Sequence, residues 1–172
     1  LKNPNARTIP AAFKPLAADC NIELRLAGKD PNGNCTDGIV RVYSHLTEEA
    51  GDQVKSLSYW DSERYLNVWV VKSIYDFTTG PGTILGYAQF PGSDPSSDGL
   101  VMRSDYIGAT GTGNTGYNGR VLAHELGHWL GLRHIWGDWE CGDDNVDDTP
   151  TAYGPNAGCP AYPHVSCSNE PD

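Results

Sequence analysis

Three histidines and a glutamate fall within eleven consecutive residues of this chain, His124-Glu125-Leu126-Gly127-His128-Trp129-Leu130-Gly131-Leu132-Arg133-His134. The stretch has the form HExxHxxGxxH. On an α-helix, residues four apart project from the same face, so that His124 and His128 can bind one tetrahedral zinc ion. Glu125 points to one side of that face, where its carboxylate can bond a water molecule instead of binding the metal.

The third histidine requires the helix to end. Gly131 stands where a left-handed residue would terminate the helix and reverse the chain, which brings His134 back as a ligand from outside the helix. Three protein ligands leave a fourth position for water, which is typical of catalytic zinc, whereas structural zinc favours cysteines and a closed shell. We therefore predict zinc at His124, His128 and His134, with Glu125 as general base and acid in peptide hydrolysis by zinc-activated water.

The composition excludes several classes of protein. A length of 172 residues and a mass of 18.6 kDa suit one domain. The net charge of −10 argues against nucleic-acid binding, which requires a basic surface. No apolar run approaches the roughly 18 residues that a membrane span needs. The five cysteines form no CxxC pair, which indicates disulfides and a secreted, extracellular protein.

Acidic residues and cysteines mark the loops. The acidic residues within eleven positions after the motif are Asp138, Glu140, Asp143, Asp144, Asp147 and Asp148. Such a cluster fits a solvated loop or a calcium site, and its proximity to the zinc motif favours calcium. Cys20 and Cys35 flank a turn at residues 30–33, and we expect a disulfide between them. The odd number of cysteines leaves one without a partner in this sequence.

Other elements are expected from apolar alternation and turn residues. Residues 65–71 (YLNVWVV) form an apolar run that predicts a central strand. Residues 48–58 predict a short helix with Thr47 as its N-cap. Further strands or extended pieces are expected at 21–27, 38–43, 83–90 and 99–105. A glycine-rich loop at 108–119 leads into the helix that carries the motif.

The motif is similar to that of the metzincin zinc peptidases. Its flanks, NIELRLAGKDPNGN and GIVRV upstream and GDDNVDDTP downstream, resemble the pappalysin family, in particular its ulilysin-like bacterial members. The resemblance implies one α+β/α/β catalytic domain over 1–172. A twisted mixed sheet and the active-site helix would form an upper part (about 1–131) above a loop-rich lower part (about 132–172). A peptide substrate would pair with the antiparallel edge strand at 84–90, through Leu85, Gly86, Tyr87 and Ala88.

The same resemblance implies a secreted zinc endopeptidase that prefers a basic residue after the scissile bond. It also implies one or two structural calcium ions in the loop after the third histidine. The calcium ligands would be Asp144, Asp147 and Thr149, together with Asp138. The resemblance further implies a disulfide between Cys141 and Cys167, and one from Cys159 to a cysteine outside this chain.

The sequence also departs from the family pattern. Metzincins have a methionine turn after the third ligand, whereas the single methionine here, Met102, precedes the motif. An initial strand with its backing helix is not recognisable, and the sequence opens without Met or an apolar leader. We therefore expect an internal piece of a larger catalytic domain, held to the remaining pieces. The alternatives are an inactive metal-binding fragment that acts only as a binding module, and another metzincin family without the calcium site.

Overall fold

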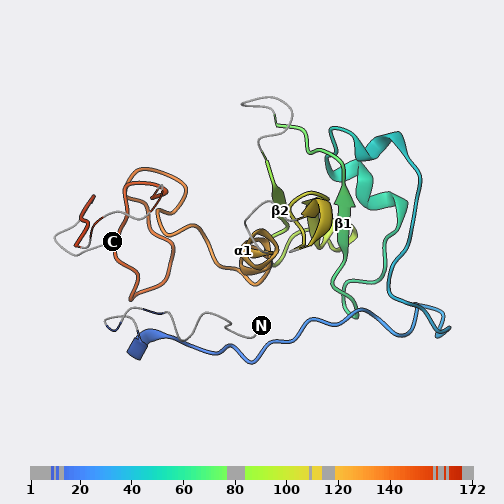
Figure 1. The fold of residues 1–172 in the computed structure, drawn as a ribbon, viewed down its shortest axis with the longest axis horizontal. Coiled ribbons are helices and arrows are strands. Elements are labelled where there is room, and N and C mark those ends of the chain that lie inside the picture. The colour runs from blue at the N-terminus through green and yellow to red at the C-terminus, as the bar shows by residue number, and fades with distance from the viewer. Residues whose placement is uncertain are drawn as a thin grey trace. The chain divides into compact units, whose positions relative to one another are not determined.

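The computed structural model describes residues 9, 11, 14–76, 84–108, 110–113, 119–156, 158, 161 and 163–167. The chain divides into two compact units, Leu1–Arg41 and Val42–Asp172, and Figure 1 shows the course of the chain through both. None of the helices found in the described part is long and apolar enough to cross a membrane.

In its described residues the first unit contains one short 3-10 helix, η2 (Lys14–Leu16), and a tight turn at 30–33. Asp30 stabilises the turn, because its Oδ1 accepts hydrogen bonds from the backbone N–H groups of Asn32 and Asn34 at 2.9 and 2.8 Å. The predicted strand at 21–27 is wrong, since this segment forms no strand and pairs with no described strand. The segment at 38–43 likewise forms no strand and pairs with no described strand.

The predicted disulfide between Cys20 and Cys35 is also wrong, because both cysteines are free and exposed. The reason lies in the register of the turn, which brings Cys35 opposite Lys29 in an antiparallel bridge. Cys20 precedes the unpaired segment at 21–27, and no described contact returns it to the turn.

The second unit is built on a mixed three-stranded sheet, as predicted. Its strands are β1 (Val68–Val71), β2 (Gly86–Ala88) and β3 (Leu100–Arg103), in the order β1-β3-β2. β1 runs parallel to β3, and β2 runs antiparallel to it. Within the described sheet the central strand is β3, and the expectation that residues 65–71 lie centrally is wrong. Accordingly β1 alternates, with Trp69 and Val71 buried but Val68 and Val70 37% and 48% exposed.

Each face of the sheet has its own core. One face packs near the 3-10 helices η3 (His45–Thr47) and η4 (Asp52–Leu57), through a buried cluster of Ala50, Val54, Trp69, Val71, Ile74 and Val101. The other face packs against the α-helix α1 (Arg120–Trp129), through a buried cluster of Leu100, Met102 and Val121. Figure 1 shows α1 beside the sheet.

The predicted helix at 48–58 is replaced by η3 and η4. Ser44, and not Thr47, caps η3, because its side chain accepts a hydrogen bond from the N–H of Leu46 at 3.2 Å. Between the two helices Ala50 forms a parallel bridge with Ile74. This pairing draws the backbone into extended geometry at the point where a continuous helix would have passed.

α1 ends as the glycine predicts. Gly131 has a φ of +98°, and its N–H donates to the carbonyl of His128 at 2.9 Å. The N–H of Leu132 donates to the carbonyl of Gly127 at 2.9 Å, which completes a Schellman turn. After this turn the described residues form neither a helix nor a strand.

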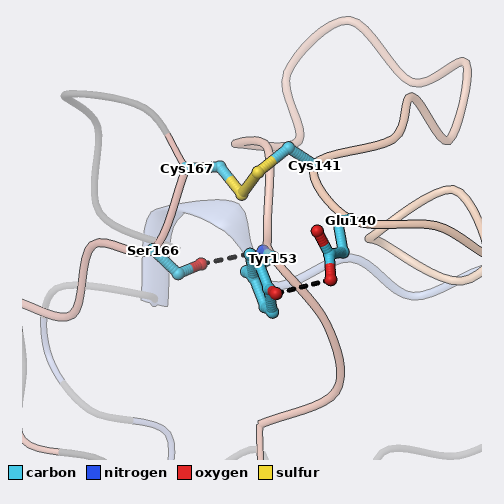
Figure 2. The surroundings of a disulfide bond; sticks show 5 residues. All are labelled: Glu140, Cys141, Tyr153, Ser166 and Cys167. Carbon is cyan, nitrogen blue, oxygen red and sulfur yellow. Dashed lines mark hydrogen bonds between the residues drawn. A yellow bond between two sulfur atoms is a disulfide. The ribbon is translucent and has the colours of Figure 1, made fainter.

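A disulfide braces this loop region. Cys141 and Cys167 are joined, as the resemblance implied (Figure 2). Beside the disulfide, the hydroxyl of Tyr153 donates to Glu140 at 2.5 Å, and the N–H of Tyr153 donates to Ser166 Oγ at 2.8 Å. The predicted pairing of Cys159 lies outside the described residues.

Candidate metal centre

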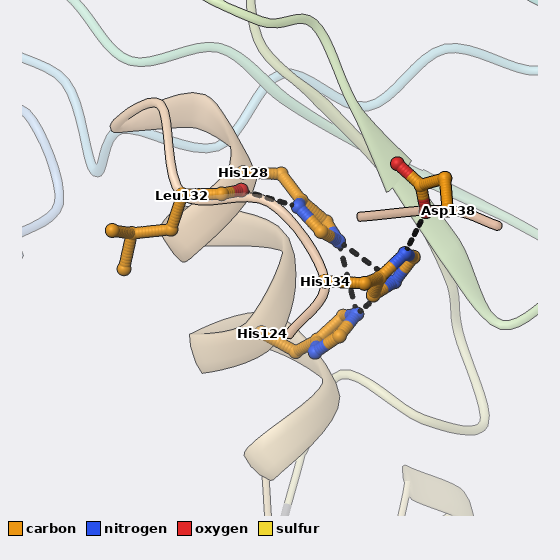
Figure 3. Close-up of polar contacts among 5 residues, drawn as sticks. All are labelled: His124, His128, Leu132, His134 and Asp138. Atoms are coloured by element: carbon orange, nitrogen blue, oxygen red, sulfur yellow. Dashed lines mark hydrogen bonds and ion pairs between the residues drawn. The ribbon is translucent and has the colours of Figure 1, made fainter. Parts of the chain in front are cut away.

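The three histidines of the motif converge on one point (Figure 3). The distances between their Nε2 atoms are 3.0 Å for His124 and His128, 3.2 Å for His128 and His134, and 3.3 Å for His124 and His134. Nitrogen ligands of a tetrahedral zinc ion, each about 2.0–2.1 Å from the metal, lie about 3.3 Å apart. The triangle therefore has nearly the size that zinc requires.

Hydrogen bonds at the other ring nitrogens assign the protonation of two of these histidines. His128 Nδ1 lies 2.7 Å from the carbonyl oxygen of Leu132, and His134 Nδ1 lies 2.5 Å from Asp138 Oδ1. Because both partners are acceptors, each Nδ1 donates to its partner, and in the neutral ring the lone pair then lies on Nε2. Two lone pairs 3.2 Å apart repel each other unless a cation lies between them, so the donor set fits zinc.

His124 is held in the neutral form by its surroundings. Burial lowers its pKa, and the neighbouring His128 and His134 lower it further. A neutral imidazole is the form that binds a metal ion. The surroundings of His124 thus favour the form that binds a metal ion.

Glu125 lies on the side of α1 that faces the sheet and is only 6% exposed. Burial raises its pKa to about 7, against a smaller opposing effect from His134. β2 passes close to this carboxyl-bearing side chain, because a Cβ added at Gly86 would lie 3.0 Å from Glu125 Cγ and 2.8 Å from Met102 Sδ. A side chain at Gly86 would therefore force Met102, Glu125 or the strand itself to shift.

The backbone of β2 has two different sides. The carbonyl of Leu85 accepts from the N–H of Arg103 at 2.9 Å, and the N–H of Gln89 donates to the carbonyl of Gly99 at 3.1 Å. Antiparallel pairing alternates, so the backbone groups of Gly86 and Ala88 point away from β3. β2 thus forms the edge of the described sheet, as expected for residues 85–88, and peptide binding there stays a prediction.

Two contacts of the third ligand escaped the sequence analysis. Asp138 was expected among the calcium ligands, yet it bonds His134. The indole of Trp136 stacks on the same imidazole, with ring centroids 4.4 Å apart and planes 4° from parallel. Trp136 and Asp138 follow His134 by two and four residues in the sequence, but only the path of the chain after the helix brings both side chains onto the imidazole.

The acidic loop does not assemble a comparable cluster. In the part of the chain that the structure describes, the histidine triad is the one group of three or more His, Cys, Asp or Glu ligands within 4.8 Å of one another. Asp144 is buried and accepts from the N–H of Val146, whereas the N–H of Thr149 donates to the carbonyl of Val146. Calcium binding by Asp138, Asp144, Asp147 and Thr149 stays a prediction.

A second polar network also went unforeseen. Lys55 is buried, and its Nζ lies 2.8 Å from both the carbonyl oxygen of Ser97 and Asp52 Oδ1. Asp52 in turn accepts from the hydroxyl of Tyr87 at 2.9 Å. The network ties β2 to η4 across the sheet face opposite α1.

Comparison with known proteins agrees with this geometry. The chain is 37% identical over 105 residues to an extracellular metalloprotease of Pyricularia oryzae (58% of this chain, 36% of that protein). It is 31% identical over 143 residues to one from Aspergillus fumigatus (75% and 44%). The structure resembles mature mirolysin of Tannerella forsythia in complex with a cleaved peptide, with a TM-score of 0.78 and 39% identity over 98% of this chain and 65% of mirolysin.

A complex of mirolysin with a small compound gives a TM-score of 0.80 at 41% identity, over 96% of this chain and 64% of that one. The chain thus spans less than two thirds of the length of these relatives, and the expectation that companion segments complete the domain stays a prediction. Residues 48–171 match the peptidase M43 family model, described as Pregnancy-associated plasma protein-A. This protein belongs to the peptidase M43, or pappalysin, family of metalloproteases.

Proposed function

We propose that this chain carries the active site of a secreted, zinc-dependent endopeptidase. The observation that carries the proposal is the convergence of the three histidine Nε2 atoms within 3.0–3.3 Å of one another. Family membership supports it, as do relatives that are named extracellular metalloproteases.

His124, His128 and His134 would hold the zinc ion. When bound, zinc polarises the scissile carbonyl and lowers the pKa of a water molecule. Glu125 would take the proton of the attacking water and return it to the departing amine. Its burial supports this role, because a carboxyl whose pKa is about 7 exchanges protons readily near neutral pH.

A peptide substrate would add to the sheet at β2. The free backbone side of Gly86 and Ala88 offers donors and acceptors for an extended chain, and Gly86 lies beside Glu125. Mirolysin has been solved with a cleaved peptide, which supports the same substrate class here. A basic residue after the scissile bond and one or two structural calcium ions are proposed from the family resemblance alone.

The decisive test compares zinc content with peptide hydrolysis in one charge-matched pair of variants. Glu125→Gln should keep zinc and lose hydrolysis by about 10²–10⁴-fold, because the ligands remain while the base is removed. Glu63→Gln, at an exposed carboxylate on the same unit, should behave as wild type. A chelator should abolish hydrolysis and added zinc should restore it. Retained hydrolysis by Glu125→Gln would refute the assignment, and a wild type that binds zinc but cleaves nothing would favour the binding-module alternative.

A further inference from the structure

His134 is the metal ligand that the helix does not hold. His124 and His128 project from α1, whose backbone fixes their spacing. His134 follows the Schellman turn, in a region where the described residues form no helix or strand. Its imidazole must therefore be oriented by local contacts, or metal binding would carry the entropic cost of ordering it.

Two contacts restrain that ring in different directions. Asp138 Oδ1 accepts from Nδ1 and resists rotation of the ring within its own plane. The Trp136 indole lies parallel to the imidazole, at 4.4 Å between centroids and 4° between planes, and resists tilting out of that plane. Together the two contacts define where the lone pair on Nε2 points.

The loop keeps Trp136 in place through its backbone. The N–H of Gly137 donates to the carbonyl of His134 at 2.8 Å, which closes a turn around Trp136. The carbonyl of Trp136 accepts from the N–H of Gly142 at 3.1 Å. Gly142 follows Cys141, whose disulfide to Cys167 anchors the far side of the loop. A Cβ at Gly142 would lie 2.5 Å from the Trp136 carbonyl oxygen, which shows how closely the loop is packed.

We infer that Trp136 is a positioning residue for the third metal ligand: its indole holds the plane of the His134 imidazole while Asp138 holds the ring proton. This inference rests on the proposed zinc site. The inference predicts that position 136 requires a planar aromatic ring that can stack on the imidazole, and not only an apolar side chain of similar volume.

The test measures zinc affinity by competition with a chelator, independently of hydrolysis. Trp136→Leu keeps an apolar side chain but removes the flat ring, and zinc affinity should fall about tenfold. Trp136→Phe retains a ring that can stack, and its affinity should stay within about threefold of wild type. Trp139→Leu is the matched control, because Trp139 lies in the same loop and is 68% exposed; its affinity should be unchanged.

A spectroscopic readout separates orientation from folding. With cobalt in place of zinc, Trp136→Leu should change the visible absorption bands of the bound ion, whereas Trp136→Phe and Trp139→Leu should preserve them. In the wild type, bound cobalt should quench tryptophan fluorescence. Trp129, Trp136 and Trp139 should each be replaced by phenylalanine, and the quenching should decrease most in Trp136→Phe. This measurement uses a conservative variant and holds even if Trp136→Leu does not fold.

The outcomes are distinct. Wild-type affinity and an unchanged cobalt spectrum in Trp136→Leu would overturn the inference. Equal losses in Trp136→Leu and Trp139→Leu would also overturn it, because they would indicate general loosening of the loop. A wild type that binds no zinc would instead refute the proposed function itself.

Discussion

Replacing Gly86 by alanine tests the contact between the edge strand β2 and the helix α1, which carries the candidate base. The added methyl group would lie 2.8 Å from Met102 Sδ, 3.0 Å from Glu125 Cγ and 3.2 Å from the carbonyl oxygen of Val101. All three distances are shorter than the roughly 3.5–4.0 Å of comfortable contact between heavy atoms. Either β2 moves away from α1, or the Glu125 side chain is displaced.

The magnitude follows from this overlap. Overpacking a filled interior typically costs about 1–3 kcal/mol, and Met102 is fully buried and cannot easily yield. For a chain of this size, about 2 kcal/mol lowers the Tm by roughly 4–8 °C. A displacement of Glu125 by even part of an ångström should lower hydrolysis by up to about 10²-fold. Zinc affinity should not change, because none of the three atoms nearest to the new methyl group belongs to a histidine.

Thermal unfolding, zinc affinity and hydrolysis should be measured on the same samples. Gly154→Ala is the matched control, because a methyl group there meets nothing within 4 Å and its φ is not positive. The double variant Gly86→Ala/Met102→Val removes the sulfur atom and should recover part of the lost Tm. Wild-type stability and hydrolysis in Gly86→Ala would show that β2 does not pack against Glu125 as described.

Three further predictions concern the surroundings of the site. Asp138→Asn should weaken zinc binding about tenfold or more in a chelator competition, because the carboxylate no longer orients His134; an unchanged affinity would exclude that role. Burial opposes ionisation of Asp52, yet bonds from Lys55, Tyr87 and Gln89 lower its pKa overall. A carboxyl whose pKa is lower in the folded than in the unfolded protein stabilises the fold at pH values above the unfolded-state pKa. This stabilisation is lost as the pH falls through the folded-state pKa. Asp52→Asn should therefore have a lower Tm than wild type at pH 7, and the difference in Tm should disappear at about pH 2. An equal difference at both pH values would contradict this prediction. Cys141→Ser opens a disulfide with a sequence separation of 26 residues and should cost about 3 kcal/mol in chemical unfolding; unchanged stability would show that the disulfide does not brace the loop.

The sequence-based predictions succeed where a feature depends on neighbouring residues and fail where it depends on contacts between residues far apart in the sequence. The spacing of His124 and His128 and the helix-ending role of Gly131 depend on a few consecutive residues, and both were predictable. The mixed sheet and the edge position of β2 were also anticipated, since the resemblance carries the topology. The predicted helix at 48–58 failed because Ala50 pairs with Ile74, a contact between distant positions that local propensity does not register.

The disulfides illustrate the same limit. Cys20 and Cys35 were paired because a turn lies between them, but the register of that turn places Lys29 opposite Cys35. The pairing of Cys141 with Cys167 came from the family resemblance and is confirmed. Spacing along the chain shows that cysteines can meet, and only the backbone path decides which of them do.

By itself, the sequence determined the candidate metal ligands and the candidate base, because helical periodicity places His124, Glu125 and His128 without reference to the rest of the chain. The tertiary structure alone decided how these groups are tuned. Burial against β2 raises the pKa of Glu125, and the loop after Gly131 brings Trp136 and Asp138 onto His134. The physical reason is that ligand spacing is a property of one helix, whereas desolvation and ring orientation depend on what other segments place beside it.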